Sequence, residues 1–309
     1  MRVAFVGKGG SGKTTISSGF INLILKKNLP MMIFDADINM HLSLLLGLKS
    51  NENKLISNEE NTIKIREYLK GKNDKIKSAN HFVKTTPPGI GSNLISIKSE
   101  DNFLNLFGTK IKNNAFFFEV GTYEKETIGT SCYHTNLSIL ENVLTHTNDK
   151  ENELVIVDMV AGTDAFSNTF HLLFDKIVFI LEATQESIKV YKKYLELAKH
   201  VNIEDKIIPI LNKAEEEDLE YLKNNGIEVK YSIPYSKEIR KISQNNQNFI
   251  PEIITTNMNN LYEDIKNQTQ NKEKFLEKLH QLHLKYSSQD YIVKTIGNID
   301  EQIDKNFKY

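Results

Sequence analysis

The residues between Gly7 and Thr15 have the types and the spacing that hold phosphate groups. They satisfy the pattern G-x-x-x-x-G-K-[ST] and stand between a predicted strand and a predicted helix. The glycines let backbone N–H groups converge on phosphate oxygens, while Lys13 would neutralise phosphate charge and the Thr14 hydroxyl would ligate Mg²⁺. The alternative is a glycine-rich turn that binds no ligand. We expect a nucleotide phosphate site made by these residues: Gly9, Gly10, Ser11, Gly12, Lys13, Thr14 and Thr15.

Two further groups of acids follow apolar, strand-like runs. Met31–Asp35 is followed by Asp37, so that two carboxylates lie at the carboxyl end of a strand, where ligands bind in open α/β sheets. Leu154–Asp158 also ends in a carboxylate, which can hold Mg²⁺ through water, and the Gly162 N–H can reach a γ-phosphate. The alternative for the first pair is that both acids are solvated turn residues.

Asn212 ends a third apolar run, Ile207–Asn212. Its side-chain amide can both donate to and accept from a purine edge, which predicts a role in base recognition. The competing interpretation is that Asn212 caps the acidic helix predicted over Glu215–Asn225.

The elements that would position these residues alternate along the chain. Short apolar runs rich in β-branched and aromatic residues are apolar on both faces and are separated by helical patterns. This alternation predicts an α/β fold: a doubly wound, mostly parallel sheet flanked by helices. The predicted strands are Val3–Val6, Met31–Asp35, Leu94–Ile97, Ala115–Glu119, Leu154–Asp158, Lys176–Leu181, Ile207–Asn212 and Val229–Ile233. The predicted helices are Lys13–Lys27, Leu137–Thr147, Ser187–His200, Glu215–Asn225 and Ser236–Ser243.

Two regions depart from this alternation, and they suggest the domain organisation. Residues 49–113 are polar and read as an insertion within a nucleotide domain over 1–245, whereas 246–309 form a mostly helical C-terminal extension. Within the extension, Asn257–Tyr286 is predicted to be helical. An apolar stripe on this helix is expected to dock on the main domain or on a second copy of the chain. The stripe consists of Phe275, Leu279, Leu282 and Tyr286. His280 and His283 are expected to be solvated rather than metal ligands.

Composition narrows the classes of function. The 39 Lys+Arg and 40 Asp+Glu residues give a formal net charge of −1, which argues against wrapping nucleic acid or coating an anionic membrane. The single cysteine, Cys132, excludes an internal disulfide. The N-terminus lacks the layout of a signal peptide, and no run is long enough to span a membrane. We therefore expect a cytoplasmic protein.

The phosphate loop carries a second lysine, Lys8. The resulting pattern, GKGG-x-GKTT, resembles the deviant Walker A loop of the MinD/ParA/nitrogenase-iron-protein class. In that class the early lysine reaches across a dimer interface to the partner's nucleotide. The resemblance therefore implies a homodimer with ATP at its interface and Lys8 and Lys13 acting in catalysis. The alternative for Lys8 is a solvated surface lysine.

The acids fit the same resemblance. Residues 35–39 resemble switch I of the class, which implies that Asp37 orients or deprotonates the attacking water and that Asp35 supports the loop and the metal shell. Ile38 stands where proline is usual. The D-x-x-A-G pattern from Asp158 to Gly162 resembles switch II. Ile233-Pro234-Tyr235 resembles the loop that flanks adenine, which makes Pro234 a nucleotide-binding candidate.

Within the class, residues 7–15, Phe118–His134 and D-M-V-A-G together most resemble the CooC-type ATPase, an accessory protein for nickel insertion into carbon monoxide dehydrogenase. That family has Cys-x-Cys where this chain has Cys132 and His134. Two copies of each residue would make an S₂N₂ site at a dimer axis, suited to Zn²⁺ or Ni²⁺. The alternative is that metal handling was lost and the loop was kept as an interface.

The resemblance implies a slow, dimer-dependent ATPase that converts ATP and water to ADP and phosphate. The leading hypothesis is a switch that assists metal insertion into, or maturation of, a client metalloenzyme. The alternative is a ParA/MinD-like positioning or partitioning ATPase that acts on DNA, a membrane or a protein partner.

Overall fold

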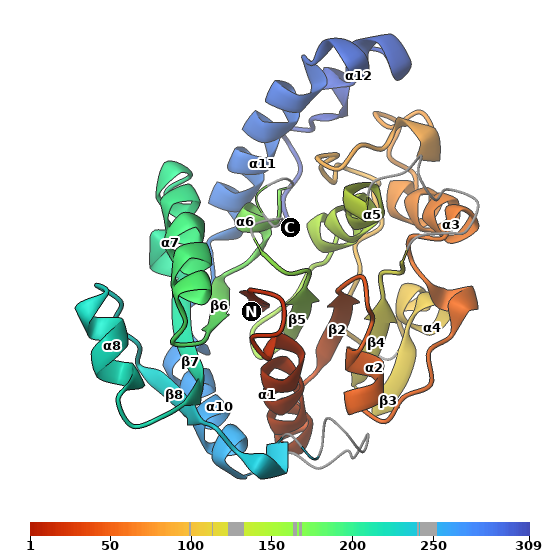
Figure 1. The fold of residues 1–309 in the computed structure, drawn as a ribbon. Coiled ribbons are helices and arrows are strands. Elements are labelled where there is room, and N and C mark those ends of the chain that lie inside the picture. Colours follow the sequence, from red (N-terminus) through yellow and green to blue (C-terminus); the bar gives the residue numbers. More distant parts are fainter. Residues whose placement is uncertain are drawn as a thin grey trace.

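The structure is a computed structural model that describes residues 1–98, 100–112, 114–122, 133–162, 166, 169–239, 241 and 252–309, with the backbone alone for 133–135. The strands are β1 (Arg2–Gly7), β2 (Met31–Ala36), β3 (Thr109–Lys112), β4 (Ala115–Glu119), β5 (Leu154–Met159), β6 (Lys176–Leu181), β7 (Ile207–Ala214) and β8 (Tyr231–Pro234). They form one sheet in the order β3-β4-β2-β5-β1-β6-β7-β8 (Figure 1).

All neighbouring strands in this sheet are parallel except β3, which runs antiparallel to β4 at one edge. Alternate side chains of each strand enter two separate hydrophobic cores. In β1, Val3 and Phe5 belong to one core, and Ala4 and Val6 belong to the other. The interior strands are buried on both faces, which confirms the predicted doubly wound α/β sheet.

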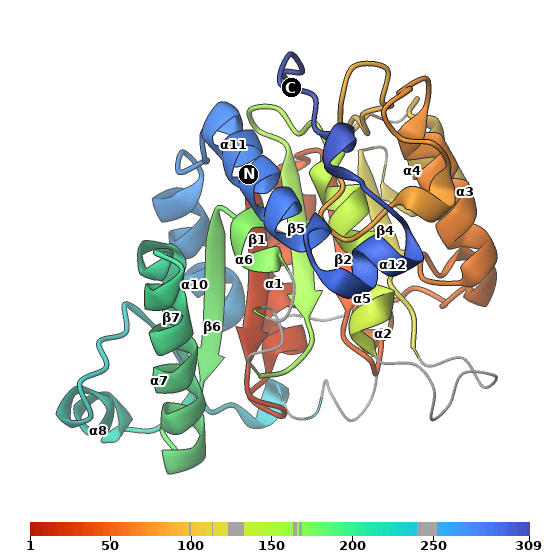
Figure 2. The ribbon, with the colours of Figure 1, turned by 90° about the horizontal axis from the view of Figure 1, so that it is seen from above.

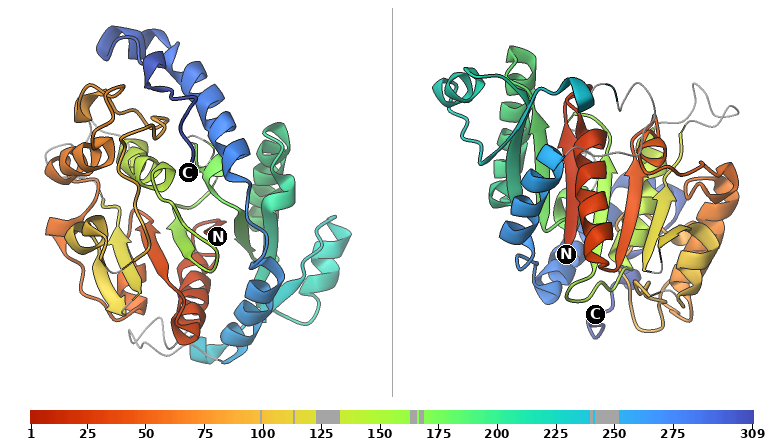
Figure 3. Two further views of the ribbon diagram at one scale, coloured as in Figure 1. Left: turned by 180° about the vertical axis from the view of Figure 1, so that it is seen from behind. Right: turned by 90° about the horizontal axis from the view of Figure 1, so that it is seen from below.

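Helices cover both faces of the sheet (Figure 2, Figure 3). The face that contains Val3 and Phe5 is covered by α1 (Lys13–Lys27), α2 (Leu42–Leu45) and α10 (Glu252–Ile265). The other is covered by α3 (Glu59–Lys70), α4 (Asn102–Phe107), α5 (Tyr133–Thr145), α6 (Phe170–Leu173), α7 (Gln185–His200), α8 (Asp218–Asn224) and α11 (Lys272–Ser287). A final helix, α12 (Asp290–Thr295), packs beside the insertion. Among the described residues, no helix combines the length and apolarity needed to cross a membrane.

The C-terminal extension packs on both faces of the sheet. α10 packs on α1, and α11 places Phe275, Leu276 and Leu279 in the opposite core (Figure 1). The predicted continuous helix over Asn257–Tyr286 is wrong. The chain leaves α10 after Ile265, passes the amino ends of the strands and starts α11 where the Asn271 side chain accepts a hydrogen bond from the Lys274 N–H. The apolar stripe of α11 does dock on the main domain.

One predicted strand is wrong, and one strand of the sheet was not predicted. Leu94–Ile97 is not a strand, because Ile95 makes only an isolated bridge to Thr147 and the Ser96 N–H bonds the Asp101 carboxylate. β3 was missed, because its alternating lysines are exposed at an edge of the sheet, where charge is common. The predicted domain boundary at residue 245 lies outside the described residues.

His283 is buried rather than solvated. Its Nδ1 lies 3.0 Å from the Thr85 hydroxyl oxygen, and its Nε2 lies 3.0 Å from the Ile299 carbonyl oxygen. These contacts join α11 to the insertion, so His283 acts as a structural residue of the extension. His280, one turn earlier, is half-buried.

Candidate nucleotide site

The carboxyl ends of neighbouring strands bring most of the predicted site residues together. The glycine-rich loop follows β1, Asp35 lies near the end of β2, Asp158 near the end of β5, and Asn212 near the end of β7. Asp35 and Asp158 occupy the same register position on paired strands. Because these strands lie side by side and parallel, residues distant in sequence meet at one edge of the sheet.

The glycines of the loop are required by its shape. Gly12 has a left-handed backbone with φ 95°, and a Cβ there would lie 2.3 Å from the Asn212 side-chain nitrogen. A Cβ at Gly7 would lie 2.3 Å from the Ile180 carbonyl oxygen. Gly12 is also the N-cap residue of α1, whose first turn has neither a side-chain cap nor an acidic residue. The backbone N–H groups there are available to an anion.

The Lys13 ammonium lies beside switch I. Its Nζ is 3.9 Å from the Asp37 Oδ2, and only 6% of the Lys13 side chain is exposed. The structure thus joins the predicted phosphate-binding lysine to the acid predicted to act on water. Lys8 is half-buried, and its carbonyl oxygen accepts a hydrogen bond from the Ser11 N–H. The part of Lys8 in a dimer stays a prediction.

Asp35 shapes the switch I turn from inside the protein. The side chain is fully buried, and its two oxygens accept hydrogen bonds from the backbone N–H groups of Asp37 at 3.2 Å and Leu42 at 2.9 Å. These bonds hold the turn without the proline that is usual at the position of Ile38. Burial and the neighbouring Asp158 raise the pKa of Asp35 well above its usual range.

Asp158 is buried without completing a hydrogen bond at either oxygen among the described residues. Burial raises its pKa to about 7, against the opposing effects of the Thr14 hydroxyl and the Lys13 charge. A cation would relieve the cost of ionising this carboxylate beside Asp35, so the residues present fit Mg²⁺. No three His, Cys, Asp or Glu side chains of the described residues gather into a metal cluster. Mg²⁺ is usually held by one or two carboxylates together with substrate phosphates.

Gly162 lies against the phosphate loop with φ 85°. Its N–H donates to the Gly7 carbonyl oxygen at 3.0 Å, so the predicted contact with a γ-phosphate requires this N–H to change partner. The Ser11 hydroxyl in the same loop is fully buried and has no hydrogen-bond partner in the described part of the chain. Ser11 and Asp158 are therefore two buried polar groups of the candidate site whose side-chain oxygens complete no hydrogen bond among the described residues.

A cavity of about 410 Å³ adjoins the loop on the side of β7 and β8. Its lining includes the predicted residues Asn212 and Pro234, together with Tyr235. The Asn212 side-chain nitrogen donates to the Ser11 carbonyl oxygen at 2.8 Å. Asn212 does not cap the following helix, since α8 begins at Asp218 with Glu217 as its cap. Its contact with a purine stays a prediction.

Lys213 was not predicted as a site residue. Its ammonium donates to the Gly10 carbonyl oxygen at 3.0 Å and pairs with Glu182, so it supports the outer side of the loop. The available signal was its place directly after Asn212 at the end of a strand. Its role depends on a backbone with φ 56°, which the sequence does not reveal.

Comparison with known proteins identifies the family. Residues 3–249 match the family model described as the CobQ/CobB/MinD/ParA nucleotide binding domain. The chain belongs to this family. It is also 30% identical over 247 residues to an uncharacterised ATP-binding protein of Methanocaldococcus jannaschii, covering 78% of this chain and 88% of the relative.

Solved structures with the fold of the CobQ/CobB/MinD/ParA family agree. A ParA family ATPase of Chlorobium tepidum is similar with a TM-score of 0.57 and 13% identity, covering 84% of this chain and 97% of that one. The septum site-determining protein MinD of Pyrococcus horikoshii, complexed with Mg-ADP, has a TM-score of 0.52 and 14% identity, covering 86% and 95%. These likenesses confirm the fold.

The predicted transition-metal site consists of Cys132 and His134. Cys132 lies outside the described residues, and His134 is described only by its backbone, in the first turn of α5. The match to the CobQ/CobB/MinD/ParA family does not show the narrower similarity to CooC-type ATPases. The pairing of Cys132 with His134 on a metal stays a prediction.

Proposed function

We propose that this chain is a Mg²⁺-dependent ATPase that works as a dimeric switch. The observation that supports this most is the meeting of Lys13, Asp37 and the buried carboxylate of Asp158 at the end of the glycine-rich loop. A cationic side chain, free backbone N–H groups and a buried carboxylate suit a nucleotide triphosphate with its metal ion.

Each residue has a separate task in this proposal. Lys13 and the loop N–H groups bind the phosphates, and the Thr14 hydroxyl and Asp158 hold Mg²⁺, with Asp35 behind them. The ion, when bound, neutralises charge on the phosphate oxygens. Asp37 orients the attacking water and accepts its proton, a role that its closeness to the phosphate-binding Lys13 supports. Asn212 and Pro234 flank the base.

The dimer in this proposal depends on Lys8. If Lys8 of each subunit completes the other's site, turnover per chain rises with protein concentration over the range in which dimers form. ATP would favour the closed dimer only by binding it more tightly than it binds the open form. A turnover number independent of concentration across dimer formation would contradict the role of Lys8.

The test uses three variants and one control. Lys13→Ala is expected to abolish nucleotide binding, and Lys8→Ala to retain binding but remove the concentration dependence of hydrolysis. Asp37→Ala is expected to bind ATP without turning it over. Lys26→Ala, an exposed lysine at the far end of α1, is the matched control and should behave as wild type. Equal hydrolysis by all four variants would contradict the proposal.

The proposed output is assistance to the maturation of a client metalloenzyme, in the manner of CooC-type ATPases. It is supported by the positions of Cys132 and His134 in the sequence alone. The test is the Ni²⁺ and Zn²⁺ content of protein purified without oxygen, for wild type and Cys132→Ser, with ADP or an ATP analogue. Absence of metal from wild type removes this output. Co-sedimentation of the ATP-analogue form with DNA or vesicles would favour a positioning ATPase instead.

A further inference from the structure

Glu141 is a buried acid that the proposed nucleotide site does not use. It lies on α5, where its side chain is fully buried within the core between the sheet and the helices. One oxygen accepts hydrogen bonds from both the backbone N–H and the hydroxyl of Thr169, and the other oxygen has no hydrogen-bond partner in the described residues. Burying a carboxylate costs free energy of folding unless the group is hydrogen-bonded or paired with a cation.

Thr169 follows switch II, the residues from Asp158 to Gly162, along the chain. It immediately precedes α6, is 2% exposed, and follows Asp158 and Gly162 by less than a dozen residues. Switch II is held by the hydrogen bond from the Gly162 N–H to the Gly7 carbonyl oxygen. Glu141 therefore holds Thr169, and the phosphate loop holds Gly162.

The same part of α5 contacts the insertion and the extension. The side-chain nitrogen of Asn142, the next residue, donates to the Val83 carbonyl oxygen at 2.8 Å. Val83 packs with Ile292 and Ile299 of the extension. α6 itself packs against both α5 and α11, and all three helices lie on the same side of the sheet (Figure 1).

We propose that Glu141 is a positioning residue that sets the end of the segment after switch II through Thr169 and couples it to the extension. This inference rests on the proposed ATPase function. Burial raises the pKa of Glu141 to about 7, against the opposing effects of the two hydrogen bonds from Thr169 and of the Lys84 charge. Burial raises the pKa of Tyr286 on α11, and the charge of Glu141 adds to this shift. Loss of the acceptor would leave two buried donors of Thr169 unpaired, which displaces the start of α6 without touching the phosphate loop.

Glu141→Leu removes the acceptor, Glu141→Gln keeps it without the charge, and Val143→Ala perturbs the same buried helix but spares the contact. We expect Glu141→Leu to lower kcat about tenfold and leave the Kd of an ATP analogue within about twofold. Glu141→Gln should restore kcat and lose the component of the pH–rate profile near neutrality. Equal kcat in Glu141→Leu and Val143→Ala, or no rescue by Gln, would overturn the inference.

Thr169→Val removes one donor, and it serves as the milder variant if Glu141→Leu does not fold. It should lower kcat about threefold. Amide hydrogen exchange of the peptide over Thr169–Leu173, with and without ATP analogue, reads the coupling without turnover. We expect faster exchange in Glu141→Leu than in Val143→Ala, and unchanged exchange would overturn the inference. Wild type that binds but does not hydrolyse ATP would overturn the proposed function, while exchange would still decide the role of Glu141.

Discussion

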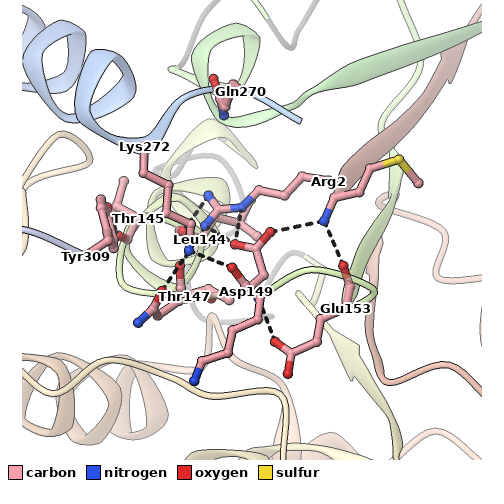
Figure 4. A network of polar contacts seen from close by, with 12 residues as sticks. Arg2, Leu144, Thr145, Thr147, Asp149, Glu153, Gln270, Lys272 and Tyr309 are labelled. Carbon is pink, nitrogen blue, oxygen red and sulfur yellow. Dashed lines mark hydrogen bonds and ion pairs between the residues drawn. The ribbon is translucent and has the colours of Figure 1, made fainter. Parts of the chain in front are cut away.

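Buried charged groups at the two edges of the sheet differ in their hydrogen bonding. At the amino ends of the strands, the Arg2 guanidinium bonds the Asp149 carboxylate and the carbonyl oxygens of Leu144 and Thr147 (Figure 4). At the carboxyl ends, the oxygens of Asp158 complete no hydrogen bond among the described residues. A buried charge whose partners are all supplied by the chain is structural, whereas the Asp158 carboxylate beside the glycine-rich loop suits a cation.

Cavity volume does not indicate which edge of the sheet holds the candidate nucleotide site. The cavity at the amino edge, lined by Arg2, Asp149, Lys272 and Tyr309, has about 540 Å³, against about 410 Å³ beside Asn212. Lys272 donates to the Asn148 side chain and to the Asp149 carbonyl oxygen, which fixes the start of α11 there (Figure 4). The groups around the larger cavity are committed to holding the extension, so its chemistry is less available than that of the smaller one.

The largest effect is expected from breaking the amino edge. Asp149→Ala would leave the Arg2 charge buried without its partner and lower the free energy of unfolding by about 3–5 kcal/mol. ATP affinity of the folded fraction should stay unchanged. Urea denaturation and nucleotide titration measure the two quantities, and Glu151→Ala, exposed nearby, is the control. Loss of ATP affinity without loss of stability would reverse the assignment of the two edges.

Asp37→Ala alters the carboxyl edge and is expected to lower turnover rather than stability. Removing the group that acts on water should lower kcat about 100-fold or more while ATP binding and stability are kept. Steady-state hydrolysis, nucleotide titration and thermal unfolding together separate these outcomes. A variant that still turns over ATP at the wild-type rate would show that another residue acts on the water.

Glu141 gives a pH test on the stability of the fold. A glutamate titrates near 4.5 in the unfolded chain and near 7 in the folded one, so the folded chain binds more protons in this interval. Stability should therefore fall as pH rises from about 4.5 to 7 and level off above it. Glu141→Gln lacks this contribution and should be more stable than wild type at pH 8, by on the order of 2 kcal/mol, and not at pH 4.5. Parallel stability curves for the two proteins would contradict this.

The smallest effect should come from neutralising Asp158. Asp158→Asn removes a buried charge beside Asp35, so the free energy of unfolding without nucleotide and Mg²⁺ should rise by roughly 1–2 kcal/mol at pH 8. Mg²⁺-dependent nucleotide binding should weaken in the same variant. Chemical denaturation and titrations with and without Mg²⁺ provide the measurements. Lower stability in the variant would mean that the carboxylate is partnered as a structural group.

Local patterns predicted what local interactions determine. α1 was predicted over Lys13–Lys27 and is found there, since Gly12 precedes it and Asn28, with φ 55°, ends it. The false strand at Leu94–Ile97 and the break after Ile265 depend on contacts with distant segments. The burial of His283 depends on Thr85, almost two hundred residues away in sequence. No pattern within a helix could reveal such a contact.

The candidate site likewise combines residues that the sequence predicted with contacts that only the structure revealed. The glycine-rich loop, Asp37 and Asp158 were predicted, because their residue types follow strands whose carboxyl ends meet at one edge. The hydrogen bonds of Asp35 to Asp37 and Leu42, the support of Gly10 by Lys213 and the contact of Glu141 with Thr169 required the three-dimensional structure. These second interactions depend on side-chain direction and burial, which residue spacing does not specify.

Calorimetric titration of wild type and Lys13→Ala with a slowly hydrolysed ATP analogue and Mg²⁺ tests the central claim most directly. The account predicts one nucleotide bound per chain for wild type and none for a Lys13→Ala protein that unfolds at the wild-type temperature. Equal binding by both proteins, or no binding by wild type, would contradict the assignment of the carboxyl edge as the nucleotide site.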